Sequence, residues 1–439
     1  MKRIEGLHFY INIANLNEVI ADEEYKTKKV NHSIHALDTF FSSIERFGNK
    51  HFKSFVVEKV TGSRLHMYVE DADVSAAFVV VAEVSKFAHR LTSFINNDIS
   101  KYKTLKNFRI QIGACYGRFY SFEFKTEDID EETTIGYAAN YAAKLQGLAL
   151  PGYIAISSNI YEALADNDSF EKRKDGRIKK YDQEYYATAL ISSLTSSFDI
   201  SEELSDVKEK ANDLNLSDIV FTNATKELDF SGLSRKSAKD IIGIPFFSDV
   251  RGFTSQFEED DSNLEEMAEK TQSILSSMYA VVRKYHGVHI QFQGDREFAV
   301  FHNYSNYDCV VDAVQAGLRM IDEVHTYKVS VGIGESLGRL FAAKIGARGE
   351  KDNILIGTTV TQADKLEDEE AKENQLVISK EIYESLKSQK PKWAKYFNKV
   401  NDNCFRITIG YSKLLNSISQ EQLLENNKQN NYNKAWGEY

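Results

Sequence analysis

Cysteine and long apolar runs are both scarce in this chain. The three cysteines, Cys115, Cys309 and Cys404, are odd in number, far apart and without metal-ligand spacing. This excludes a disulfide framework, and we expect reduced, buried thiols. The longest apolar run, residues 76–82, is far too short to cross a bilayer, and no hydrophobic signal segment follows Met1. These absences predict a soluble, cytoplasmic protein without a membrane partner.

Positive charge is also in deficit. Lysine and arginine total 54 against 65 aspartates and glutamates, which gives a formal net charge of −11. Such a balance excludes nucleic acid as a general partner, because a phosphate backbone demands a basic face. An acidic protein that binds a nucleotide must gather its cations locally or bring a metal. The length of 439 residues and an apolar content of 42% allow two or three domains with full cores.

The chain contains an internal duplication. Residues 156–164 and 378–386 share the pattern Ile-Ser-x-x-Ile-Tyr-Glu-x-Leu. Gly136 and Gly357 are almost as far apart in the sequence as these two segments are, and so are Lys144 and Lys365. The hairpin glycines Gly62 and Gly294 are separated by slightly more residues. The drift in spacing places insertions in loops and leaves the elements aligned, as two homologous domains require.

Both copies have the predicted order strand, helix, hairpin, helix, strand, helix, strand. This order predicts an α+β fold, with a mainly antiparallel sheet and helices on one face. We expect a first domain at residues 1–195, a structured linker at 196–238, a second domain at 239–415 and a polar, mobile tail at 416–439.

The second copy carries two aspartates at predicted strand ends. An apolar strand from residue 241 ends on Asp249, and the turn at 250–254 leads into a helix whose first N–H groups can meet an anion. Asp295 occupies the tip of a predicted hairpin spanning 286–301. If that hairpin pairs beside the first strand, the two carboxylates meet and suit Mg²⁺ or Mn²⁺ bridged to a nucleoside triphosphate.

Two segments carry a family resemblance. Phe-Phe-Ser-Asp-Val-Arg-Gly-Phe-Thr at 246–254 and Gln-Gly-Asp-Arg-Glu-Phe-Ala-Val-Phe at 293–301 resemble the metal-site segments of class III nucleotidyl cyclases. The resemblance implies two tandem ferredoxin-like cyclase domains and a two-metal site. It assigns metal binding to Asp249, Val250 and Asp295, and binding of the substrate polyphosphate to Arg251, Gly252, Phe253 and Thr254. Residues 294–298 also resemble the diguanylate cyclase signature, but an extra residue intrudes and the segment at 246–254 fits that family poorly.

The first copy has lost the acids. Asn12 and Ser63 stand where Asp249 and Asp295 stand in the second copy, and neutral side chains cannot supply the charge that a divalent ion requires. Class III cyclases work as dimers whose sites span the interface. The resemblance makes Lys59 and Thr133 of the first copy base-reading residues, and it makes Asn140 and Lys144 catalytic residues for the transition state. The second copy's equivalents are Gln291, Thr361 and Lys365. The chain then forms an intramolecular pseudo-heterodimer with one working site.

One of these residues departs from the family pattern, and others also allow a purely structural interpretation. Lys144 stands where the family usually has arginine, and lysine cannot bind two oxygens in a planar fork. Thr133 follows an acidic run and could cap a loop. Arg251 and Arg296 flank the aspartates and could bind phosphate or only neutralise them.

Hydrogen-bond chemistry narrows the base without fixing it. Lys59 only donates, so it suits adenine N1 or a pyrimidine carbonyl, whereas Thr133 suits adenine's amino group or the N3–H and O4 of uracil. GTP is disfavoured, and ATP and UTP stay open. The Lys and Thr pair resembles that of soluble bicarbonate-responsive adenylyl cyclases. The stand-alone organisation resembles bacterial anti-phage (Pycsar-type) pyrimidine cyclases, whose product is read by a separate effector, and it favours UTP. The alternatives are an adenylyl cyclase and a catalytically dead nucleotide-binding module.

Overall fold

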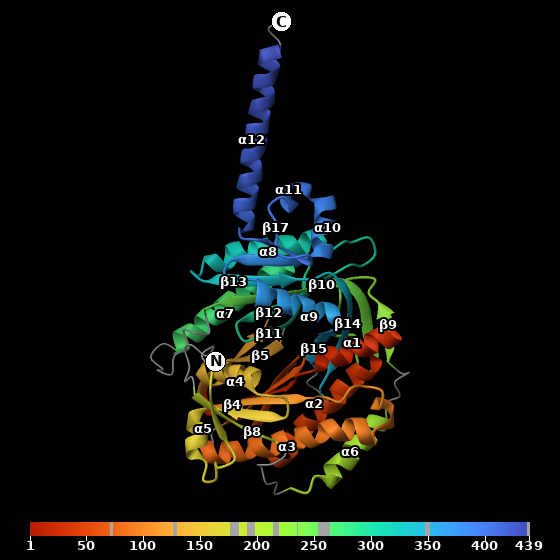
Figure 1. The fold of residues 1–439 in the computed structure, drawn as a ribbon, viewed down its shortest axis with the longest axis vertical. Coiled ribbons are helices and arrows are strands. Elements are labelled where there is room, and N and C mark those ends of the chain that lie inside the picture. The colour runs from red at the N-terminus through yellow and green to blue at the C-terminus, as the bar shows by residue number, and fades with distance from the viewer. Residues whose placement is uncertain are drawn as a thin grey trace.

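Two similar sheets, one per copy, are stacked along the long axis of the molecule (Figure 1). The computed structural model describes residues 1–70, 73–125, 130–175, 184–190, 198–213, 219–234, 236–252, 264–346 and 352–436. Within this part of the chain, none of the helices has the length and apolar character needed to cross a membrane. All three cysteines are buried, as predicted, and none forms a disulfide within the described part of the chain.

The first domain has the strand order β2-β3-β1-β4-β6-β8-β7, and β5 pairs with β4. Its elements are β1 (Lys2–Ile13), α1 (Leu16–Thr27), α2 (Asn31–His51), β2 (Phe55–Thr61), β3 (Arg64–Glu70), α3 (Val74–Asp98), β4 (Ile110–Lys125), β5 (Asp130–Ile135), α4 (Tyr137–Leu148), β6 (Tyr153–Ile156), α5 (Ser158–Ala163), β7 (Glu171–Lys174) and β8 (Glu184–Ala189). Helix α6 (Ser201–Asn212) follows and packs against the same domain.

The second domain repeats that order as β11-β12-β10-β13-β16-β18-β17, with β14 and β15 as counterparts of the far half of β4 and of β5. Its elements are β9 (Val220–Asn223), β10 (Ser237–Arg251), α7 (Leu264–Lys284), β11 (Val288–Gln293), β12 (Arg296–His302), α8 (Val310–His325), β13 (Ser330–Glu335), β14 (Gly338–Ile345), β15 (Asp352–Ile356), α9 (Thr358–Lys365), a π-helical turn η5 (Leu366–Glu370), β16 (Gln375–Ser379), α10 (Lys380–Gln389), α11 (Pro391–Ala394), β17 (Asn398–Lys399), β18 (Cys404–Ile407) and α12 (Tyr411–Trp436). The predicted duplication and α+β fold class are confirmed.

Alternation along β10 decides which side chains reach the site. Phe246 and Val250 enter the core beneath α7 and α8, whereas Phe247 lies on the opposite face and stacks on Phe298 at a centroid distance of 4.2 Å. Asp249 has the parity of Phe247, because side chains two apart share one face of a strand. Burial of such aromatic side chains, worth about 1.5–3 kcal/mol each, fixes the register that presents Asp249 on the α9 side.

The two domains exchange strand arms. Phe122 and Phe124 of β4 and Ile135 at the end of β5 join the hydrophobic core of the second domain, where Phe124 meets Phe292 at 4.7 Å. In return, β14 and β15 place apolar side chains such as Phe341 and Ile354 in the core of the first domain. Each core is therefore completed by the other half of the chain, as a pseudo-dimer requires.

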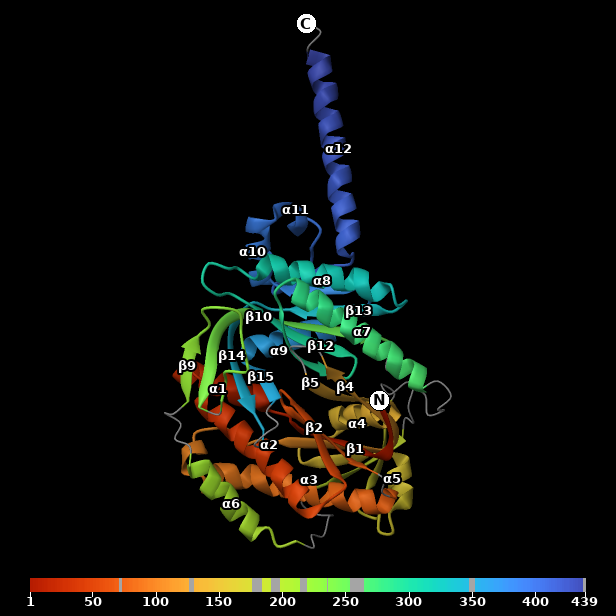
Figure 2. The ribbon, with the colours of Figure 1, turned by 180° about the vertical axis from the view of Figure 1, so that it is seen from behind.

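The predicted polar tail at 416–439 belongs, as far as Trp436, to a helix that begins at Tyr411. This helix, α12, projects away from the second domain (Figures 1 and 2). Its first turns are anchored on α8, where Leu414 is buried and the Arg319 guanidinium lies 4.2 Å from the centre of the Tyr411 ring. Both contacts lie before residue 416, within the predicted second domain, and they hold the start of the helix.

One carboxyl group in the second core lacks a hydrogen-bond partner among the described residues. Glu335 on β13 is 0% exposed, neither of its side-chain oxygens is hydrogen-bonded there, and a Cβ at Gly317 of α8 would lie 2.8 Å from Oε1. Burial raises the pKa of Glu335 to about 8. The folded protein therefore keeps this group protonated at neutral pH.

Glu335→Gln should flatten the dependence of stability on pH. Because the folded-state pKa lies above the unfolded value, the stabilising contribution is complete below the unfolded pKa and is lost as pH rises towards 8. Up to several kcal/mol is at stake, since a difference of one between the folded and unfolded pKa values corresponds to about 1.4 kcal/mol. Urea unfolding between pH 5 and pH 9 measures the effect, and exposed Glu265→Gln is the control. Parallel pH curves for the wild type and Glu335→Gln would contradict this assignment.

Candidate active site

The two aspartates of the second copy meet at one corner of its sheet. Asp249 pairs with Arg296 across the ladder between β10 and β12, and Asp295 directly precedes Arg296 at the hairpin tip. Gly294 makes that tight turn possible because its φ is +70°. Burial and the neighbouring Asp295 raise the pKa of Asp249 to about 7, so the two carboxylates repel each other.

This corner fits a hard divalent cation. The Asp249 side chain is 28% exposed, so it can reach a ligand. Val250 buries its side chain in the core and can contribute only its main-chain carbonyl. Two mutually repelling carboxylates and a carbonyl are the oxygen donors that Mg²⁺ and Mn²⁺ prefer. Arg251 Nη1 donates to Asp249 Oδ2 at 2.9 Å, so one carboxylate oxygen already has a protein partner.

The two flanking arginines bind protein groups. Arg251 Nη2 donates to the main-chain oxygens of Glu367 at 2.6 Å and Ala371 at 2.9 Å, and it lies 2.5 Å from the Glu367 carboxylate. Arg296 Nη2 pairs with Asp364 at 2.7 Å and with Glu367 at 2.6 Å. The sequence left phosphate binding and charge neutralisation open for these arginines, and these contacts agree with charge neutralisation.

The remaining members of the predicted polyphosphate loop are only partly placed. Gly252 follows the last residue of β10 and has a φ of +69°, a left-handed conformation that favours glycine. Phe253 and Thr254 lie outside the described residues. Their role in binding the substrate polyphosphate stays a prediction.

Lys59 reaches across the domain boundary to the hairpin that carries Asp295. It is 3% exposed, and its Nζ donates to Glu131 Oε1 at 2.6 Å and to the main-chain oxygen of Phe292 at 3.0 Å. Burial alone would lower the pKa of Lys59, but the carboxylates of Glu131 and Glu58 outweigh it and raise the pKa. The structure thus places a cation of the first domain against β11, the strand that leads to Asp295.

Thr133 lies beside this contact, two positions after Glu131 on β5. It is buried, and among the described residues its hydroxyl has no hydrogen-bond partner. An unpaired buried hydroxyl costs about 1–3 kcal/mol. A ligand with a polar ring edge would remove that cost.

Glu131 is the residue that our sequence reasoning missed. Besides Lys59, its carboxylate accepts the Phe292 N–H at 2.9 and 3.1 Å and contacts His289 Nε2 at 3.1 Å. The other half has the same device, because Asp352 Oδ2 accepts the Val60 N–H at 2.7 Å. Glu131 and Asp352 are separated by the same stretch of sequence as the repeated glycines at 136 and 357, and that recurrence was the available signal.

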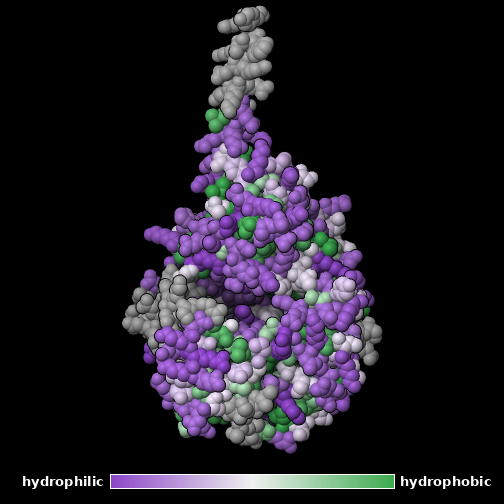
Figure 3. Space-filling view, in the orientation of Figure 1, coloured by the Kyte–Doolittle hydropathy of each residue, from purple (hydrophilic) through white to green (hydrophobic). Residues whose placement is uncertain are grey.

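The predicted catalytic pair lies on α4. Asn140 is half-buried and Lys144 is exposed, and their spacing of one helical turn gives them one helix face. Close approach of α4 to β4 depends on Gly113, where a Cβ would overlap the helix backbone. Figure 3 shows a hollow with hydrophilic walls between the two domains, bordered by α4 on one side and by β12 and α9 on the other. These residues are therefore carried by a helix that borders the interdomain hollow.

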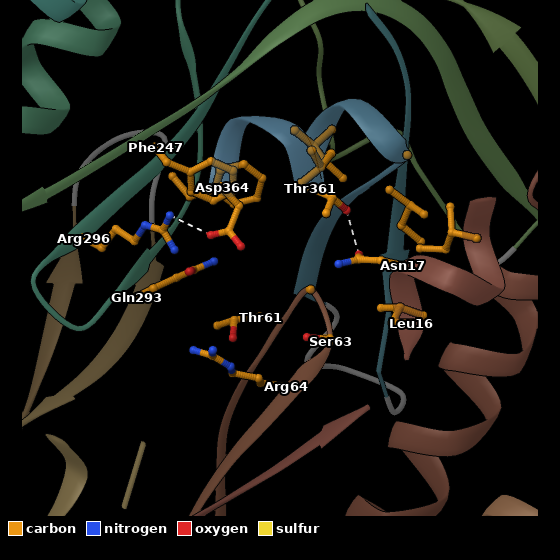
Figure 4. A pocket seen from close by; sticks show the side chains of 17 residues that line it. Leu16, Asn17, Thr61, Ser63, Arg64, Phe247, Gln293, Arg296, Thr361 and Asp364 are labelled. Atoms are coloured by element: carbon orange, nitrogen blue, oxygen red, sulfur yellow. Dashed lines mark hydrogen bonds and ion pairs between the residues drawn. The ribbon is translucent and has the colours of Figure 1, made fainter. Parts of the chain in front are cut away.

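The pseudo-symmetric counterpart of this site lacks the acids. Ser63 Oγ donates to Asn12 Oδ1 at 2.7 Å, so a neutral hydrogen-bonded pair replaces the two carboxylates. A cavity of about 120 Å³ lies beside Ser63, between the β2–β3 hairpin and α9 (Figure 4). Across it, Thr361 Oγ1 donates to Asn17 Oδ1 at 2.7 Å. These four neutral side chains do not suit a divalent cation, and the Asp364 carboxylate that also lines the cavity is paired with Arg296.

Comparisons with known proteins agree with this architecture. Residues 235–409 match the family described as adenylate and guanylate cyclase catalytic domain. No curated protein matches the chain. A solved structure, a class III adenylyl cyclase-like ATP-binding protein from Pseudomonas aeruginosa, is similar at a TM-score of 0.69 and 16% identity, covering 95% of this chain and 90% of that one.

A single-domain structure is similar over a shorter stretch. The adenylyl cyclase CyaB from P. aeruginosa gives a TM-score of 0.33 at 22% identity, covering 38% of this chain and 93% of that one. The longer similarity shows the two-domain fold of this chain. The family match covers residues 235–409 and gives this stretch the description of an adenylate and guanylate cyclase catalytic domain, a family of phosphorus–oxygen lyases.

Proposed function

We propose that this chain converts a nucleoside triphosphate into a 3′,5′-cyclic nucleotide and pyrophosphate at one composite site. The observation that carries the proposal is the contact of the Lys59 ammonium with Phe292 O, on the hairpin that carries Asp295. It joins the base-reading side of the first domain to the acidic corner of the second. The counterpart site has no such acids, since Ser63 and Asn12 occupy their positions among the described residues.

The reaction is an attack of the ribose 3′-oxygen on the α-phosphorus, with pyrophosphate leaving in line. Mg²⁺ or Mn²⁺ held by Asp249, Asp295 and the Val250 carbonyl would supply charge stabilisation and a lowered 3′-hydroxyl pKa. Asn140 would orient the ribose. Lys144 would stabilise the negative charge that grows on the α-phosphate. No covalent intermediate with the protein is needed.

UTP is the substrate that we favour, with ATP as the alternative. Glu131 and Phe292 accept two of the three Lys59 N–H donors, and Glu58 Oε1 lies 3.6 Å from Nζ, beyond hydrogen-bond distance. The third donor can therefore meet a ring acceptor such as a uracil carbonyl or adenine N1. The Thr133 hydroxyl, without a partner among the described residues, can pair with uracil N3–H or with the adenine amino group. The stand-alone organisation favours a pyrimidine. We propose that cyclic UMP then acts as a second messenger for a separate effector in anti-phage defence.

The test is incubation of the intact chain with each of UTP, CTP, ATP and GTP and Mn²⁺, followed by chromatography of the products. We expect a cyclic monophosphate and an equal amount of pyrophosphate, with UTP as the best substrate. Cyclic AMP as the main product would select the alternative base. Absence of cyclic product from all four would contradict the proposal.

A second candidate is a nucleotide-binding module without turnover. It is favoured by the Arg251 contact on Asp249, which competes with a metal, and by lysine in place of arginine at position 144. The similar two-domain protein from P. aeruginosa is itself described as an ATP-binding protein. Saturable nucleotide binding together with no product in the same assay would identify this function.

Thr133→Val should change base preference without destabilising the nucleotide-free protein. The substitution keeps the shape and removes a hydroxyl that has no partner within the described part of the chain. Loss of one hydrogen bond to a buried base atom costs about 1–3 kcal/mol, so the ratio of kcat/KM between preferred and poor substrates should shift about tenfold. Lys59→Ala should shift the same ratio. As the control, Lys144→Ala should slow all substrates alike. Unchanged ratios in both Thr133→Val and Lys59→Ala would mean that the base is read elsewhere.

A further inference from the structure

A second cavity lies at the open edge of the second sheet. It has a volume of about 620 Å³, is open to solvent on one side, and is lined by the segment 226–231, helix α7, strand β11 and the β14–β15 arm. We call it the linker cavity and define it by Lys226, Asp229, Tyr279, Arg283, His289 and Lys344. Its volume is typical of small-molecule sites.

The walls of the linker cavity carry an excess of positive charge, although Lys226 and Lys344 both attract the Asp229 carboxylate and help to lower its pKa. Arg283 is neutralised by Glu227 at 2.6 Å. Asp229 accepts hydrogen bonds from the N–H and the hydroxyl of Ser231 at 2.8 and 2.6 Å, which hold it as an anion. Among the described residues, neither Lys226 nor Lys344 has an ion-pair partner within 4.0 Å. Two ammonium groups thus face one carboxylate, in a chain whose net charge is −11.

The floor of the cavity is apolar and partly aromatic. Leu228, Phe230 and Val288 line it and belong to a buried core cluster. The Tyr279 ring stands edge-on to His289, with centroids 5.7 Å apart. Cations above an apolar floor suit an organic anion with a ring, since the lysines can bind phosphate oxygens while the floor takes the ring.

One wall residue connects the cavity to Lys59. His289 is 6% exposed, with Nδ1 2.8 Å from Glu297 Oε1 and Nε2 3.1 Å from Glu131 Oε2. Burial would lower the pKa of His289, but Glu297 and Glu131 outweigh it and raise the pKa to about 9. The imidazolium therefore donates through both nitrogens. The other oxygen of Glu131 holds Lys59 at 2.6 Å, so two hydrogen bonds separate the cavity wall from the base-reading lysine.

We propose that the linker cavity binds a phosphate-bearing organic anion on Lys226 and Lys344, and that His289 and Glu131 transmit its presence to Lys59. An anion beside the imidazolium competes with Glu131 for its charge. Glu131 then pairs more strongly with Lys59 and changes how the remaining ammonium donor is presented. The binding part stands independently of the proposed function, whereas the effect on base reading rests on it. By linkage, a base bound at Lys59 changes the affinity of the cavity by the same factor.

The binding test uses the intact chain and isothermal calorimetry in EDTA, with pyrophosphate and uridine 5′-monophosphate as probes. EDTA removes the divalent ions through which Asp249 and Asp295 would hold phosphates. We expect saturable binding of at least one probe, weakened tenfold or more in the variant Lys226→Ala with Lys344→Ala. Exposed Lys236→Ala is the matched control and should bind normally. An unchanged unfolding midpoint shows that the double variant is folded. No binding of either probe, or equal affinity in the double variant, would overturn the proposal.

The transmission test follows the imidazole itself. In ¹⁵N-histidine-labelled protein, with the signals assigned through His289→Gln, the binding probe should move the His289 resonances along the calorimetric binding curve. Glu131→Gln should change the size of that movement without abolishing binding of the probe. Resonances of His289 that stay fixed at saturation would overturn the transmission. Neither test requires cyclase activity, so failure of the proposed function and failure of this proposal give different results.

Discussion

Alanine at Asp249 or Asp295 is expected to abolish nucleotide turnover. Both carboxylates lie at one corner of the second sheet, where the charge of one makes ionisation of the other less favourable. Loss of a divalent ligand removes several kcal/mol of charge stabilisation, and about 4 kcal/mol corresponds to roughly a thousandfold in rate. Steady-state assays with Mn²⁺ and the best triphosphate measure the effect.

The pseudo-symmetric positions provide the controls. Asn12→Ala and Ser63→Ala remove a neutral hydrogen-bonded pair from the counterpart site and should leave most of the activity. The aspartate variants should fold at least as stably as the wild type, since each relieves the repulsion that raises the pKa of Asp249. Near-normal turnover by either aspartate variant would contradict the assignment of Asp249 and Asp295 as metal ligands.

Separation of the two halves should also abolish activity, and mixing them should restore it. A cut between α6 and β9 leaves α6 on the first domain and β9 paired with β10 on the second. The first half keeps Lys59, Thr133, Asn140 and Lys144 without the acids. The second half keeps the acids but has only Gln291, Thr361 and Lys365 to offer a copy of itself.

Physical costs accompany the cut. Each half exposes the apolar arm that completes the other core, Phe122 and Phe124 on one side and Phe341 and Ile354 on the other. Separate halves should therefore be poorly soluble and should associate strongly. Activity of the mixture should rise with concentration, because the linker no longer supplies an effective concentration in the millimolar range. A mixture whose second half carries Asp295→Ala is the control. Full activity of the second half alone would overturn the composite site.

Much of the fold was predictable because its signals are local or periodic. The repeated spacing identified two domains, and the run before Asp249 together with the turn at Gly294 gave the strand and the hairpin that form the acidic corner. The strand arms were not predictable from the same patterns. Phe122 and Phe124 have the pattern of ordinary strand residues, and only the tertiary structure shows that their core belongs to the other domain.

The candidate site, too, was predictable only in part. Lys59 and Thr133 were found through their resemblance to a family, whereas the Glu131 contact with Phe292 joins positions that are far apart in sequence. Glu131 was not singled out because it lies in an acidic run beside Thr133, although Asp352 occupies the equivalent position in the second copy. Arg251 finds its partners at the turn formed by residues 366–370. Its guanidinium fits there because Gly332 has no side chain, since a Cβ at that position would overlap it. Such contacts leave no periodic trace in a sequence.

The central claim is that one composite site, built from both halves, binds the nucleotide with its metals. Equilibrium binding of 3′-deoxy-UTP and 3′-deoxy-ATP to the intact chain tests it most directly, because neither analogue has the attacking hydroxyl. With Mn²⁺ titrated by electron paramagnetic resonance, we expect one metal-dependent nucleotide and two Mn²⁺ per chain. Ser63→Ala should keep this stoichiometry and Asp295→Ala should lose it. Two metal-dependent nucleotides per chain, or undiminished Mn²⁺ binding in Asp295→Ala, would contradict the claim.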